Sequence, residues 1–196
     1  TVSNGGDVLI PVYSSGIVYD LIEFIRSYLN SLNLHSTNMY FVSPTAKHSL
    51  AYSNISAEWL CASKQDKAFV AEPPFQHHSL LASRQLQVFE SVDAEFAQVY
   101  HQNRANPCII FAGHPSCRFG DILHLIKIFD KNAKNAMICI EPDYIFNNVI
   151  APFEFTVPNS PLSTGIPEHM SVMHCPVDFR LKRGEVHHLI KTIEPE

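Results

Sequence analysis

Continuous apolar runs of strand length recur along this chain. They cover residues 7–13 (DVLIPVY), 39–42 (MYFV), 107–112 (PCIIFA), 136–140 (AMICI) and 170–175 (MSVMHC). Apolar residues follow one another in these runs instead of alternating with polar ones, which is typical of strands that are covered on both faces in a parallel sheet. The pattern therefore predicts a central sheet that is mostly parallel.

Helical spacing of apolar residues follows most of these runs. In residues 17–32 the apolar positions are Val18, Leu21, Ile22, Ile25, Tyr28, Leu29 and Leu32, and Glu23, Arg26, Ser27 and Asn30 occupy the other face. A second helical stretch follows Ser43-Pro44-Thr45 and ends near Cys61, a third covers 122–129, and a short helix is expected at 145–150. Strands that alternate with helices in this way predict a Rossmann-like α/β fold, a mostly parallel sheet flanked by helices.

Two regions carry a weaker signal. Residues 66–92, which include EPPFQHH, suggest an extended loop with one short strand. Residues 152–168 hold four prolines together with Asn-Ser-Pro and Ser-Thr-Gly, and such residues mark a surface excursion. The length of 196 residues predicts a single main domain.

Composition narrows the class of protein. A hydrophobic content of 46% with 17% charged residues indicates an ordered globular chain, and the net charge of −5 argues against a free-standing nucleic-acid-binding domain. No apolar run approaches 18 residues, so no membrane span is expected. The chain starts without Met or a leader pattern, and we expect it to be an excerpt of a longer protein. An odd count of five cysteines without C-x-x-C favours a reducing compartment.

Polar residues follow the first strand. Ser14-Ser15-Gly16 precedes a predicted helix, so backbone N–H groups there could bind a phosphate or another small ligand. The loop matches neither G-x-x-x-x-G-K-[ST] nor G-x-G-x-x-G. The competing interpretation is structural, with the serines capping the helix.

The loop GHPSCRFGD follows the strand at 107–112. His114 and Ser116 could form a nucleophilic pair, but they flank Pro115 in one turn, which leaves little room for the required geometry. Arg118 is a candidate phosphate ligand. The competing interpretation is a structural turn that places Asp121 at the start of the next helix.

The histidines do not follow a metal-binding motif. The chain has 11 of them, none in H-x-H-x-D-H or H-E-x-x-H. The doublets His77-His78 and His187-His188 direct neighbouring side chains differently. We therefore predict no metal site within this chain.

Several of these phrases together resemble the β-CASP region of the metallo-β-lactamase-fold nucleases. They are LIPVYSSGIVYDLIEFI, YFVSPTAKHSLAYSNISAEWL, PCIIFAGHPSCRFGDILHLIKIF and MHCPVDFRL. Within that group EPPFQHH, GHPSCRFGD, EPDY and CPVDFRL are similar to the subunit 9 family of the Integrator complex. The likeness covers nearly the whole chain and weakens over 84–106 and 152–168.

The resemblance implies a β-CASP domain over 7–168, inserted into a metallo-β-lactamase domain, and a return strand and helix toward that second domain over 169–196. Active members place a zinc-binding histidine at the end of the last strand, two positions before a conserved acid. Alignment on Asp178 puts Pro176 at that histidine position, and a second ligand position falls near Ala151. Neither side chain can bind zinc, so the resemblance implies a chain without catalytic residues, metal or cofactor.

The implied function is that of a nuclear scaffold. A non-catalytic subunit of this family would pair with the active endonuclease, Integrator subunit 11, and with other Integrator subunits in 3′-end processing of small nuclear RNA. RNA would reach this chain through the complex, and Ser14, Ser15, His114 and Arg118 are the candidates for contact. The alternatives are a non-catalytic subunit of the cleavage and polyadenylation factor, and an active metal-dependent RNA hydrolase.

Overall fold

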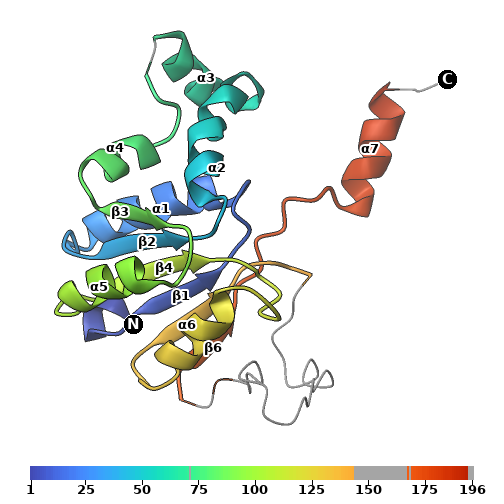
Figure 1. Cartoon of the computed structure of the whole chain (residues 1–196). Coiled ribbons are helices and arrows are strands. Elements are labelled where there is room, and N and C mark those ends of the chain that lie inside the picture. Colours follow the sequence, from blue (N-terminus) through green and yellow to red (C-terminus); the bar gives the residue numbers. More distant parts are fainter. Residues whose placement is uncertain (71, 144–166, 168, 194–196) are drawn as a thin grey trace.

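A six-stranded parallel sheet forms the centre of the molecule (Figure 1). The computed structural model describes residues 1–70, 72–143, 167 and 169–193. The strands are β1 (Val8–Pro11), β2 (Asn38–Val42), β3 (Leu86–Phe89), β4 (Cys108–Ala112), β5 (Ala136–Cys139) and β6 (Ser171–His174). Their order is β3-β2-β4-β1-β5-β6, and every recorded pair among these strands is parallel. The predicted α/β fold with a parallel sheet is confirmed.

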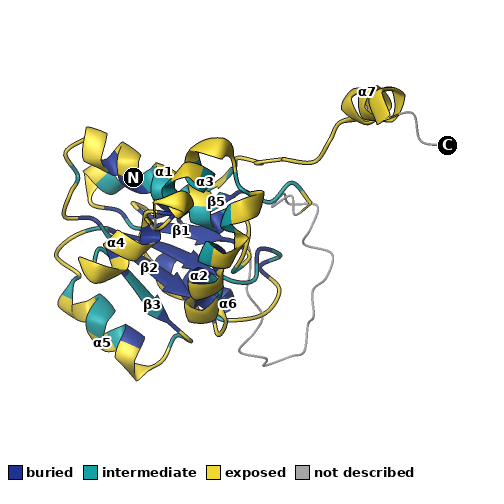
Figure 2. Ribbon diagram, turned by 90° about the horizontal axis from the view of Figure 1, so that it is seen from above, coloured by how far each residue is buried: buried dark blue, intermediate teal, exposed yellow. Residues whose placement is uncertain are grey.

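Helices cover both faces of the sheet. They are η1 (Val2–Asn4), α1 (Val18–Ser31), α2 (Ala46–Tyr52), η2 (Ser53–Trp59), α3 (Ala62–Phe69), α4 (His77–Ala82), α5 (Ala94–Gln102), α6 (Ile122–Phe129) and α7 (Arg183–Ile193), with η1 and η2 of the 3-10 type. One apolar core lies between the sheet and α5 and α6, and the other lies between the sheet and α1, α2 and α4. The sheet is therefore the buried middle layer of three (Figure 2).

Burial on both faces explains the continuous apolar runs. In β1, Leu9 belongs to the core under α5 and α6, whereas its neighbours Val8 and Ile10 belong to the core under α1. In β4, Ile110 and Phe111 divide in the same way. Successive side chains of a strand point to opposite faces, so a strand buried on both faces must be apolar at each position.

The connections of the sheet run in two directions. From β1 the chain passes through α1 to β2, toward the β3 edge, and from β4 it passes through α6 to β5, toward the β6 edge. Because β1 and β4 are neighbours and their helices lie on opposite faces, the loops after these two strands separate. This is the switch point at which parallel α/β sheets bind ligands.

Some elements differ from the prediction. Residues 66–92, expected to be an extended loop with one strand, contain β3 but also the end of α3 and the whole of α4, and α5 was not predicted. The reason is weak amphipathicity: α3 buries no residue, α4 has six residues, and α5 buries only Phe96. The helix expected at 145–150 and most of the excursion at 152–168 lie outside the described residues.

The C-terminal helix stands apart from the sheet. All described residues of α7 are exposed, and a stretch without regular structure separates it from β6 (Figures 1 and 2). β6 itself pairs with β5 and forms the edge of the sheet. The division of the chain at residue 168 stays a prediction. None of the helices in the described ranges combines the length and the apolar character that a membrane crossing requires.

Asp7 ties three strands together at their amino ends. Its carboxylate accepts hydrogen bonds from the backbone N–H of Cys108 in β4 at 2.9 Å and from the hydroxyl of Tyr100 in α5 at 3.0 Å. Its backbone N–H donates to Asn135 Oδ1 just before β5 at 2.9 Å. Burial and the charge of Asp7 both raise the pKa of Tyr100, so this tyrosine stays a donor.

Asp7→Ala should lower the free energy of unfolding of this chain by about 3 kcal/mol, because it leaves the N–H of Cys108 without an acceptor. Tyr100→Phe is the matched control and should cost only about 1 kcal/mol, since it removes one bond and keeps the carboxylate. Urea denaturation of the three proteins measures both values. Equal losses in the two variants would contradict the assigned role of Asp7.

Candidate functional site

The loops after β1 and β4 bring the four predicted RNA-contact residues to one edge of the sheet. Ser14 and Ser15 follow β1, and His114 and Arg118 follow β4. The two strands are in register to their ends, and the N–H of Val12 continues the pairing by donating to the carbonyl of Ala112 at 3.0 Å. Both loops therefore leave the sheet at the switch point.

His114 holds these two loops together. Its ring lies edge-on to Tyr13 of the β1 loop, with centroids 5.0 Å apart, and against Phe119 of its own loop at 4.4 Å. Burial lowers the pKa of His114, so the imidazole is neutral at physiological pH. The structure thus makes His114 a packing element between the loops.

Ser116 lies closer to His114 than the sequence suggested. The turn was expected to leave little room, yet His114 Nδ1 and Ser116 Oγ are 2.9 Å apart. The backbone N–H of Ser116 donates to the same nitrogen at 3.2 Å. One ring nitrogen has a single lone pair, so the backbone bond competes with any use of Nδ1 as a general base. The pair stabilises a turn, which agrees with the structural interpretation.

Ser14 and Ser15 do not cap α1. The residue preceding the helix is Ile17, and no side chain accepts a hydrogen bond at this helix start. Ser14 Oγ is instead 2.7 Å from Thr45 Oγ1, in the loop after β2, while Ser15 is exposed. The capping interpretation was therefore wrong.

A chain of hydroxyl groups continues from Ser14 into α2. Ser49 Oγ donates to the carbonyl of Ser14 and is 2.5 Å from the hydroxyl of Tyr19 in α1. Thr45 and Ser49 were missed from the sequence, although Ser43-Pro44-Thr45 follows a predicted strand as Ser14-Ser15-Gly16 does. These contacts join the β1 and β2 loops into one polar edge. Arg118, in the loop after β4, is exposed.

The ends of β5 and β6 form a second polar region. The N–H of Val177 donates to the carbonyl of Ile140 at 2.8 Å, so Pro176 and Asp178 lie next to the segment that follows β5. Pro176 is exposed and offers no atom that could bind a metal. Ala151, the other position of interest, lies outside the described residues.

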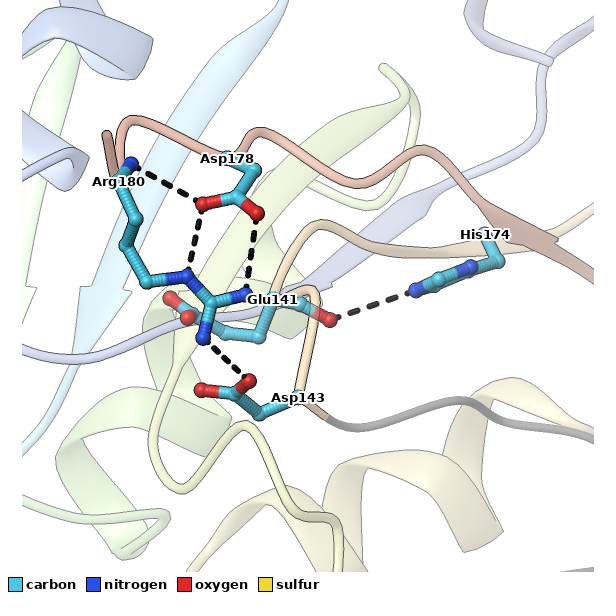
Figure 3. A network of polar contacts seen from close by, with 5 residues as sticks. All are labelled: Glu141, Asp143, His174, Asp178 and Arg180. Atoms are coloured by element: carbon cyan, nitrogen blue, oxygen red, sulfur yellow. Dashed lines mark hydrogen bonds and ion pairs between the residues drawn. The ribbon is translucent and has the colours of Figure 1, made fainter. Parts of the chain in front are cut away.

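Asp178 is held by an arginine (Figure 3). Arg180 donates from Nε to Asp178 Oδ1 at 2.8 Å and from Nη2 to Oδ2 at 3.0 Å, a bidentate pair. Its Nη1 donates to Asp143 Oδ1 at 2.7 Å, from the segment after β5. One guanidinium therefore bridges carboxylates that follow two neighbouring strands.

The pKa values of two acids in this region shift in opposite directions, for different reasons. Its hydrogen bonds lower the pKa of Asp178 to about 2. Burial and the nearby charge of Asp143 raise the pKa of Glu141, whose carbonyl oxygen lies 3.3 Å from His174 Nε2. The acid that the resemblance aligns with the nuclease site is thus ionised and neutralised by a protein cation.

The described residues do not form a zinc centre. No group of three histidine, cysteine, aspartate or glutamate side chains that could hold a metal exists within the described ranges. His77 is buried and lies 3.2 Å from the carbonyl of Leu50, and His187 and His188 are exposed on α7.

Arg180→Gln should raise the pKa of Asp178 from about 2 to about 4, its ordinary value, because the bidentate partner is lost. The Asp178–Arg180 ion pair stabilises the folded loop at pH values above the ordinary pKa of an aspartate. This stabilisation disappears as the pH falls through about 2, the pKa of Asp178 in the folded chain. Carboxyl ¹³C NMR titration measures the midpoint. Lys182→Gln is the control: it removes only a weaker coulombic influence and should change the pKa of Asp178 little. An ordinary aspartate pKa for Asp178 in the unmodified chain would refute the pairing with Arg180.

Comparison with known proteins shows the family of this chain. The Beta-Casp domain model matches residues 10–142, and the chain belongs to that family. Integrator complex subunit 9 from Homo sapiens is 40% identical over 195 residues, which is 100% of this chain and 27% of the relative. The Integrator complex subunit 9 homolog of Dictyostelium discoideum is 41% identical over 197 residues, or 25% of its length. The chain thus spans about a quarter of the length of these relatives.

Proposed function

We propose that this chain is the β-CASP part of a non-catalytic subunit of the nuclear Integrator complex. The observation that carries the proposal is the identity of 40% to Integrator complex subunit 9 along the whole chain. The subunit would act as a scaffold that pairs with the active endonuclease, subunit 11, during 3′-end processing of small nuclear RNA. The partner, and not this chain, would hydrolyse the phosphodiester.

The charge at the ends of β5 and β6 supports the non-catalytic role. Two-metal hydrolysis needs side chains that hold the cations and the attacking hydroxide. In this chain Pro176 offers no ligand, and Arg180 lies between Asp178 and Asp143. A fixed guanidinium repels a divalent cation, so this arrangement replaces the metal charge with a protein charge.

The switch-point edge is the proposed place of RNA contact. Ser14, Ser15, His114 and Arg118 lie on two loops of that edge. Arg118 would donate to a phosphate through two parallel N–H groups, and the exposed Ser15 hydroxyl would add a neutral donor. His114 would position its loop for this contact by packing against Tyr13 and Phe119.

The region from 169 onward is proposed to lead into the remainder of the longer protein, with α7 packing on the metallo-β-lactamase domain. Val186, Leu189, Ile190 and Ile193 form an apolar stripe on α7 at positions i, i+3, i+4 and i+7. These side chains are 37–63% exposed, although such a stripe is normally buried against a partner.

Affinity purification of the full-length protein from nuclear extract should recover Integrator subunits, with the endonuclease subunit at near-equal amount by quantitative mass spectrometry. The expected result follows from the identity to subunit 9. Recovery of the cleavage and polyadenylation machinery instead would transfer the scaffold role to messenger RNA precursors and overturn the Integrator assignment.

Arg118→Ala should lower the RNA cross-linking yield of this subunit in the purified complex about tenfold at limiting protein, the loss expected for one charge-assisted phosphate contact. Arg104→Ala is the matched control, because Arg104 is also exposed but lies near the amino ends of the strands. Its yield should stay unchanged. Equal cross-linking in both variants and the unmodified protein would exclude Arg118 as an RNA ligand.

A further inference from the structure

A groove runs along the β3 edge of the sheet. In the strand order, β2 separates this edge from β4 and β1, the strands of the switch point. It has a volume of about 630 Å³ and lies between α2, α4 and β3. We call it the β3-edge groove, and its lining includes Lys47, Leu50, Leu81, Arg84, Leu86 and Val88. Figure 1 shows β3 at the margin of the sheet, with α4 next to it.

Peptide groups of β3 face outward at this groove. The carbonyls of Gln85 and Phe89 accept hydrogen bonds from Met39 and Ser43 of the β2 side at 2.9 and 3.0 Å. In a parallel pair, alternate residues direct their peptide groups to the same neighbour. The N–H and carbonyl groups of Leu86 and Val88 therefore point away from β2, and β3 is the last strand on this side.

The apolar and charged groups of the groove are arranged for a peptide. Leu81 of α4, which is 37% exposed, and Ala51 of α2, which is also exposed, supply apolar surface from two helices. Lys47 and Arg84 provide positive charge, whereas no described residue that lines the groove carries a carboxylate. The positive charge of this lining contrasts with the net charge of −5 of the whole chain. Because complementary charges attract, the lining favours an anionic occupant that also carries apolar side chains.

We propose that the β3-edge groove binds an extended acidic segment of a partner protein, which adds to the sheet as a strand beside β3. Backbone hydrogen bonds to Leu86 and Val88 supply the affinity, and alternate side chains of the segment reach Ala51 and Leu81. Its carboxylates pair with Lys47 and Arg84. RNA is a poorer match, because phosphates would use the cations and leave the outward peptide groups of β3 without partners.

The test uses the full-length protein and a fluorescein-labelled octapeptide of alternating glutamate and valine. A lysine–valine octapeptide and a single-stranded RNA octamer are the comparison probes, and fluorescence anisotropy gives each Kd. The acidic peptide should bind at least tenfold more tightly than either comparison probe. Tighter binding of the RNA, or no acidic-peptide binding up to millimolar concentration, would overturn the proposal.

Two kinds of variant separate the charges from the strand edge. Lys47→Glu combined with Arg84→Glu should weaken acidic-peptide binding at least tenfold, whereas the exposed pair Lys131→Glu with Lys134→Glu should leave it unchanged. Val88→Pro removes an N–H that does not pair with β2, so the protein should fold and lose peptide binding. An unchanged peptide affinity in Val88→Pro would overturn strand addition. If the proline variant fails to fold, the Lys47→Glu, Arg84→Glu protein still tests the proposal, because unchanged acidic-peptide binding by that protein would overturn it.

Discussion

Two neighbouring buried strands, β1 and β4, send their connections to opposite faces of the sheet, and the rest of the site depends on this constraint. The chain must leave each parallel strand at its carboxyl end, and right-handed crossovers place α1 and α6 on different sides. The loops between them are the ones that hold Ser14 and His114. Packing of Tyr13 on His114 then fixes the two loops relative to each other.

The polar region at β5 and β6 has a different character from the switch-point edge. Arg180 forms direct ion pairs with both Asp178 and Asp143, so both carboxylates are bound by one protein cation. At the switch point, the hydroxyl groups of Ser14 and Thr45 lie 2.7 Å apart, and the side chain of Arg118 is exposed. We propose separate roles for the two regions, with RNA contact at the switch point and no metal site at the ends of β5 and β6.

The sequence predicted those parts of the fold that depend on burial. The strand runs and the amphipathic helices α1 and α6 were found because each buries several apolar residues, such as Ile22 and Leu125. α4 and α5 were missed because few of their residues enter the core. The same limit applies to the candidate site. Ser14 and His114 could be assigned to one edge of the sheet because both directly follow predicted parallel strands. The hydrogen bond from Arg180 to Asp143, in contrast, joins residues 37 positions apart, and these two residues meet only because β6 pairs with β5.

We propose that the longer protein positions a partner's chemistry and performs none itself. The most direct measurement is hydrolysis of a labelled small nuclear RNA precursor by the full-length protein purified without the endonuclease, with its zinc content determined on the same sample. We expect no cleavage above background and zinc well below one equivalent. Stoichiometric zinc together with cleavage that a chelator abolishes would contradict it and make the protein an active metal-dependent hydrolase.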